Sequence, residues 1–119
     1  STAKVQAKSF KINNIEISRP FEMDFSKNEV IDEGFQKAFN ELTSLIIKSS
    51  DKKKIQKIEL NEIKGMVESF TIKEEKFVDQ IYYLNLGVSF NKRKVYKFLE
   101  FKNIFPSVPK KKKNFYLFL

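Results

Sequence analysis

The segment that most constrains the fold is an amphipathic stretch running from Ser26 to Ile46. Ser26 and Glu29 have the spacing of a capping box, in which the serine hydroxyl accepts from an amide three residues on and the glutamate reaches back. Apolar residues then recur at three- and four-residue steps, at Ile31, Phe35, Ala38, Phe39, Leu42, Leu45 and Ile46. This stretch predicts a long helix that buries one face and leaves the other in water.

Extended structure is expected before this helix, from Val5 to Ile17, where β-branched and aromatic residues gather. The apolar residues change parity at Asn13-Asn14, which favours two short strands joined by a tight turn; one long strand with a bulge is the alternative. Arg19-Pro20 should end the pattern, because proline offers no amide hydrogen to a ladder.

Further elements are expected after the long helix, which a polar turn at Ser49–Lys54 should end. They are a shorter helix that buries Leu60, Ile63, Met66 and Val67, a strand at Phe70–Phe77, an alternating strand at Tyr82–Phe90, a helix capped by Asn91, and a last strand at Phe115–Leu119. The fold class is therefore α+β: a mainly antiparallel sheet with two or three helices on one face, in the order β(β)-α-α-β-β-α-β. We expect residues 1–119 to form a single domain, with the N-terminal part of a slightly longer chain as the alternative.

Lysine dominates the charge of the chain. There are 23 basic and 15 acidic residues, a net charge of +8, yet only Arg19 and Arg93 are arginine. Phosphate and base recognition favours the planar guanidinium, and only Tyr83 is an aromatic residue on a solvent-facing strand surface, so nucleic acid is disfavoured as a partner. The lysine excess also fits adenine- and thymine-rich coding.

Two sets of residues are candidates for binding. The first is cationic and would attract anions: Lys52, Lys53, Lys54, Lys92, Arg93, Lys94, Lys110, Lys111, Lys112 and Lys113. Three of these cations, Lys92, Arg93 and Lys94, stand in a first helical turn, where the positive end of the helix dipole repels them. An anion bound there would offset this repulsion. The second is aromatic and would contact a partner protein: Phe21, Phe25, Tyr83, Phe101 and Phe105.

The residue types present leave little room for catalysis. The chain has no Cys and no His, so thiol and imidazole chemistry and most zinc and haem sites are excluded. Glu74 and Glu75 point to opposite faces of a strand, while Glu59 and Glu62 lie beside lysines and suggest solvated ion pairs. No glycine-rich phosphate cradle is present. We expect a protein that is not an enzyme, with no cofactor and no metal.

An ordered set of segments resembles a known family. They are Phe10–Ile17, the helix around Gly34–Leu42, Ile63–Glu75, and Tyr82–Asn91 followed by Val95. Together they are similar to an exported domain family of Gram-negative bacteria whose function is unknown. The resemblance covers about residues 10–119 and implies an export signal and a periplasmic location, but no catalytic residues. The lysine runs depart from the family's pattern.

The expected function is that of an exported, periplasmic binding or scaffolding domain that recognises another envelope protein. The alternative is an anion- or nucleic-acid-binding module that uses the lysine clusters. No run of 18 apolar residues is present, so no membrane span is expected. The oligomeric state is open.

Overall fold

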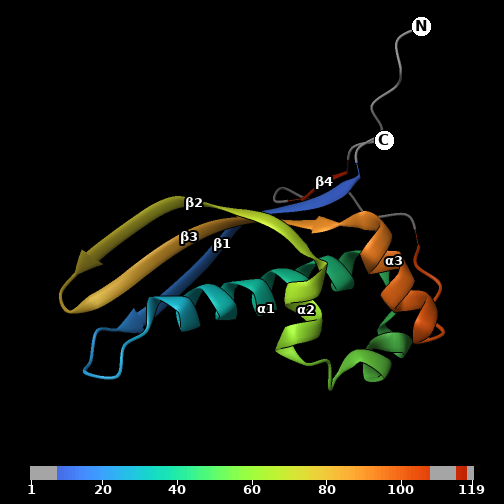
Figure 1. Cartoon of the computed structure of the whole chain (residues 1–119), viewed down its shortest axis with the longest axis horizontal. Helices are drawn as coiled ribbons and strands as arrows, with labels where there is room; N and C mark the ends of the chain where they lie inside the picture. The colour runs from blue at the N-terminus through green and yellow to red at the C-terminus, as the bar shows by residue number, and fades with distance from the viewer. Residues whose placement is uncertain (1–7, 108–114, 118–119) are drawn as a thin grey trace, which may run out of the picture.

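A computed structural model describes residues 8–107 and 115–117 of the chain. Its elements are β1 (Ser9–Pro20), α1 (Lys27–Ile46), a 3-10 helix η1 (Ser49–Ile55), α2 (Leu60–Met66), β2 (Val67–Val78), β3 (Ile81–Asn91), α3 (Lys92–Phe101) and β4 (Phe115–Leu117). The strands form one antiparallel sheet in the order β2-β3-β1-β4, and the helices lie on one side of it (Figure 1). The expected α+β class is confirmed.

Strand β1 is one continuous strand, so the prediction of two short strands is wrong. Its pairing with β3 shifts register between Ile12 and Ile15, and Asn14 takes a left-handed φ of 56° inside this bulge. The bulge turns Ile15 and Ile17 to the same face as Phe10 and Ile12, which explains the change of parity. The strand also continues through Arg19 to Pro20, where proline is tolerated because it is the last residue.

Strands β2 and β3 form a long hairpin. Asp79 and Gln80 connect them and both have positive φ, 51° and 64°, as a tight two-residue turn of a hairpin requires. Strand β2 has its own register shift between Ile72 and Glu74, level with the bulge of β1 on the other side of β3. Gly87 of β3 lies between the bulges, and a Cβ there would stand 2.8 Å from the Asn13 side-chain oxygen.

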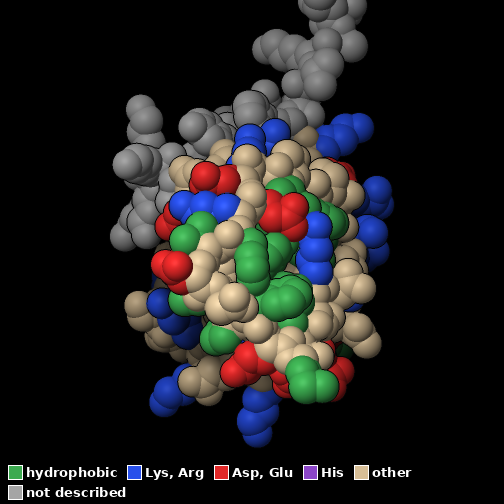
Figure 2. Space-filling view, turned by 90° about the vertical axis from the view of Figure 1, so that its left-hand side faces the viewer, with side chains coloured by type: hydrophobic (Ala, Val, Ile, Leu, Met, Phe, Trp, Pro, Cys, Tyr) green, Lys and Arg blue, Asp and Glu red, His purple; other side chains and the backbone are tan. Residues whose placement is uncertain are grey.

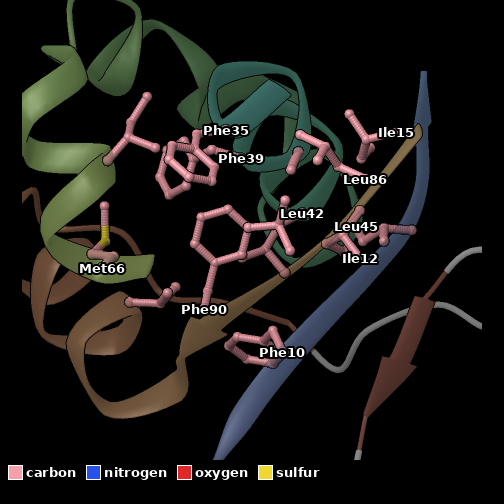
Figure 3. Close-up of a cluster of buried hydrophobic side chains, with 14 of the residues drawn as sticks. Phe10, Ile12, Ile15, Phe35, Phe39, Leu42, Leu45, Met66, Leu86 and Phe90 are labelled. Atoms are coloured by element: carbon pink, nitrogen blue, oxygen red, sulfur yellow. The ribbon is translucent and has the colours of Figure 1, made fainter. Parts of the chain in front are cut away.

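Helix α1 covers the two central strands. The Ser26 hydroxyl accepts from the Glu29 amide at 3.4 Å, which confirms the predicted N-cap. Phe39 and Leu42 are fully buried against β1 and β3, as Figure 3 shows around Leu86 and Phe90. Gly34 lets the helix approach the sheet, because an added Cβ would lie 2.4 Å from the Leu86 methyl carbon Cδ1.

Smaller differences from expectation lie at the edges of the helices. Ile31 and Leu60 are only half-buried, and the expected polar turn after α1 is the 3-10 helix η1, whose Ile55 joins the core. Helix α3 begins as expected, with the Asn91 side chain accepting from the Lys94 amide at 2.9 Å.

Candidate interaction surfaces

Strand β2 is the least covered element of the sheet. It pairs with β3 on one side, and none of the strands in residues 8–107 and 115–117 pairs with its other side, so among these it is an edge strand of 12 residues. Helix α1 packs over β1 and β3, and every residue of β2 after Val67 is exposed. Phe70, Ile72 and Phe77 belong to the face that packs against the helices in the neighbouring strands, yet they are 43%, 38% and 51% exposed.

An aromatic cluster lies at the hairpin end of this strand. The ring centroid of Phe21 stands 4.8 Å from that of Phe25 and 5.0 Å from that of Phe77, and Phe25 lies 5.0 Å from Tyr82. The Phe21 amide donates to the Gln80 carbonyl, which ties the segment before α1 to the hairpin turn. Figure 2 looks onto this end of the molecule and shows apolar side chains gathered at its centre, ringed by charged ones.

One ionised pair joins this cluster to α1. The Lys27 ammonium lies 2.8 Å from the Glu75 carboxylate, which also accepts from the Tyr82 hydroxyl. These two contacts, Lys27 first, hold the pKa of Glu75 below its usual range. Burial, and then the bond to Glu75, raise the pKa of the Tyr82 hydroxyl. Glu75 therefore connects strand and helix.

Helix α3 lies at the end of the molecule away from the hairpin turn (Figure 1). A groove of about 1100 Å³ lies beside this helix. One wall is the α3 face that carries Arg93, Tyr96, Lys97 and Glu100 at helical spacing. The rest is formed by residues at the start of β1 and α3 and just after α3: Lys8, Asn91, Lys92, Asn103, Ile104, Phe105 and Pro106. Four of the lining side chains are cationic and one is acidic.

The sheet face turned away from the helices has a smaller hollow of about 320 Å³. Glu16 and Glu74 flank Asn85 there in direct register, and Lys76 lies nearby with its ammonium 5.5 Å from the Tyr83 ring centre. The Asn85 side-chain oxygen is buried and finds no hydrogen-bond partner within the part of the chain described. This hollow mixes both signs of charge and so has little selectivity for either.

The structure separates the predicted aromatic set into three places. Phe21 and Phe25 share the cluster at the hairpin end. Tyr83 lies on the opposite sheet face, while Phe101 and Phe105, 81% and 84% exposed, are at the end of α3 and just beyond it. Only Phe105 of that last pair lines the groove.

The predicted cationic residues are also divided. Lys92 and Arg93 line the groove and Lys94 does not. Lys54 lies 3.2 Å from the Asp51 carboxylate and donates to the Asn103 carbonyl, so it holds η1 to the end of α3. Lys52 and Lys53 are exposed in η1. Lys110, Lys111, Lys112 and Lys113 lie outside the described residues.

Three of the four carboxylates considered as candidates, Glu59, Glu62 and Glu75, have structural contacts. Glu62 accepts from the Glu59 amide at 3.2 Å at the start of α2, so this pair begins a helix. No group of three or more metal-ligating His, Cys, Asp or Glu side chains occurs among the residues described. None of the helices in the described ranges is long and apolar enough to cross a membrane.

Sequence reasoning missed Phe70, Ile72 and Val78 as exposed apolar residues, and Lys8, Tyr96 and Lys97 as groove residues. In β2, simple alternation assigns Phe70 and Phe77 to opposite faces of the strand. The register shift between Ile72 and Glu74 places both on one face, and the sequence alone does not reveal this shift. The α3 face was visible as Arg93, Tyr96, Lys97 and Glu100 at helical spacing, but Lys8 reaches the groove only through the fold.

Comparisons with protein-family models, with curated proteins and with solved structures find no match for this chain. The chemistry of its surfaces is therefore the guide to its function.

Proposed function

We propose that the protein is a non-enzymatic binding domain that recognises an extended segment of another protein along strand β2. The observation that carries this proposal is an edge strand whose helix-side apolar residues, Phe70, Ile72 and Phe77, stay exposed. This holds even for Phe70, whose ring lies 5.3 Å from that of Phe35 in α1. An added strand would receive main-chain hydrogen bonds from the free edge and pack its alternate side chains beside these residues.

The charges of β2 support a selective partner. Lys73, Glu74 and Lys76 stand on the strand with mixed sign, and the register shift beside Lys73 bends the edge. Natural edge strands use such charges and bulges to prevent indiscriminate pairing. A partner segment must therefore place opposite charges against them, with apolar residues at alternate positions. The aromatic cluster around Phe21 extends the apolar contact past the end of the strand.

The cellular setting in this proposal comes from the family resemblance. From this resemblance we infer that the protein is exported to the periplasm and that its partner is another envelope protein. The structural use of Glu59, Glu62 and Glu75 supports a binding role over an enzymatic one, since these carboxylates cap a helix or join elements.

The experiment is selection from a library of 12-residue peptides on the immobilised protein. We expect peptides with alternating apolar residues, and we expect the double variant Ile72→Ser, Phe77→Ser to bind them at least about tenfold more weakly. Phe101→Ser makes the same phenylalanine-to-serine change at an exposed position on α3; it is the control and should bind as the wild type does. Circular dichroism melting verifies that the variants fold.

Two results would overturn this proposal. One is a selected peptide that binds the double variant as well as the wild type. The other is a dimer of the protein, seen by sedimentation, that the same double variant dissolves, because β2 would then pair with a second copy of the chain.

A further inference from the structure

The groove beside α3 supports a second binding site, independent of β2. We propose that it binds an organic phosphate that carries a flat ring, the chemistry of a nucleotide, with the phosphates on its cations and the ring against Tyr96 or Phe105.

The cations of the groove come from separate parts of the chain. Lys8 precedes β1, Lys92 and Arg93 begin α3, and Lys97 lies one turn further along the helix. Lys8, Arg93 and Lys97 form no ion pair or hydrogen bond through their side chains with the described residues. The Lys92 ammonium lies 5.7 Å from the centre of the Phe10 ring. Four cations thus line one groove, and their summed positive potential attracts an anion into it.

The acidic groups nearby do not neutralise this set. Glu100 is the only carboxylate among the described lining residues, one helical turn beyond Lys97. Glu68 of β2 lies near the start of α3, but it accepts from the Ser9 hydroxyl and from the Asn91 amide group, at 3.0 Å for the latter. It is not part of the lining. The net positive charge of the lining residues therefore favours an anionic ligand.

The side chains, and not the end of the helix, define the site. The Lys92 amide already donates to the Lys8 carbonyl at 2.8 Å, and the Lys94 amide to the Asn91 side chain. Arg93 offers the bidentate geometry that suits phosphate oxygens, and the lysines add point charges.

Two aromatic side chains add a preference for a ring. Tyr96 is 36% exposed, with its ring held edge-on to Phe10 at 5.5 Å. Phe105 is 84% exposed and lines the groove together with Pro106, just beyond α3. Aromatic rings of this kind stack on bases with little dependence on the base. Inorganic phosphate alone would leave both uncovered.

The test is calorimetric titration of the full chain with ADP, pyrophosphate and adenosine. We expect ADP to bind most tightly, pyrophosphate more weakly and adenosine weakest, with affinity that falls as salt rises. The double variant Arg93→Ala, Lys97→Ala should bind ADP at least about tenfold more weakly. Lys52→Ala, Lys53→Ala removes the same charge outside the groove and should leave binding unchanged.

The ring contact has its own matched pair. Phe105→Ala should weaken ADP binding and leave pyrophosphate binding unchanged, whereas Phe101→Ala, at a similarly exposed phenylalanine outside the groove, should change neither. A second measurement is thermal melting: ADP should raise the melting temperature of the wild type and not that of the double variant.

Several outcomes would overturn the proposal. They are no heat and no shift in melting with ADP, pyrophosphate binding as tight as ADP binding, or equal losses in the groove variant and in the Lys52, Lys53 variant. The last result would indicate a diffuse cationic surface. Because none of these variants touches β2, peptide binding along β2 and nucleotide binding in the groove succeed or fail separately.

Discussion

At the scale of single residues, Gly34 sets how closely α1 lies against the sheet. Replacing it with alanine would place a methyl group 2.4 Å from Leu86 Cδ1, in a fully buried part of the core. We expect Gly34→Ala to lower the free energy of unfolding by about 1–3 kcal/mol, the usual cost of overpacking. Urea unfolding at equilibrium measures this change.

Gly65 provides the matched control for that prediction. It lies inside α2, and a Cβ added there meets no atom within 4 Å. Gly65→Ala should therefore raise the free energy of unfolding by about 0.4–1 kcal/mol, because alanine restricts the unfolded chain. If both variants shift stability in the same direction, the close approach at Gly34 is not what limits packing.

At the scale of elements, Glu75 couples β2 to α1 in a way that depends on pH. Lys27, and then Tyr82, hold its pKa below the value that it has in the unfolded chain. The stabilisation is thus present above the unfolded pKa and disappears as pH falls through the lower folded pKa. We expect Glu75→Gln to lower the urea midpoint at pH 7 and to converge with the wild type in strong acid.

The neighbouring carboxylate supplies the comparison. Glu74 points to the opposite sheet face and makes no ion pair or hydrogen bond with the described residues. Glu74→Gln should leave the difference between neutral and acidic stability unchanged. An equal effect of the two variants would mean that net charge, and not the Lys27 contact, causes the loss of stability at low pH.

The elements also mark how far sequence reasoning reaches. Helix α1 and strand β3 were predictable, because each has an uninterrupted period and α1 has a side-chain cap. In both bulged strands, simple alternation of residues gives the wrong face. The change of parity at Asn13-Asn14 predicts a turn, and the odd spacing of Phe70 and Phe77 predicts opposite faces, whereas register shifts explain both. The exposure of β2 depends on which strands α1 covers, and the groove depends on Lys8 meeting α3. Both the exposure of β2 and the groove follow from the tertiary arrangement, which the sequence patterns do not give.

At the scale of the whole molecule, the last strand joins the sheet over a short stretch. The buried apolar side chains of residues 8–107 lie between Phe10 and Ile104, and the pairing of β4 covers Phe10–Ile12 of β1. A chain shortened to end at Ser107 should therefore fold cooperatively, less stable by about 1–3 kcal/mol for the lost hydrogen bonds. It should also self-associate more readily through the uncovered edge of β1. Urea unfolding and sedimentation test both effects, and a chain without a cooperative transition would contradict the prediction.

The pairing of β1 with β3 has a consequence for biosynthesis. It joins Ser9–Pro20 to Ile81–Asn91, so the two middle strands of the sheet are far apart in the chain. Such a high contact order slows folding. On the ribosome, β3 cannot complete the sheet over the apolar side of α1 until residue 91 has left the exit tunnel. We therefore expect this apolar surface to be open to chaperones, and to aggregation, until that point.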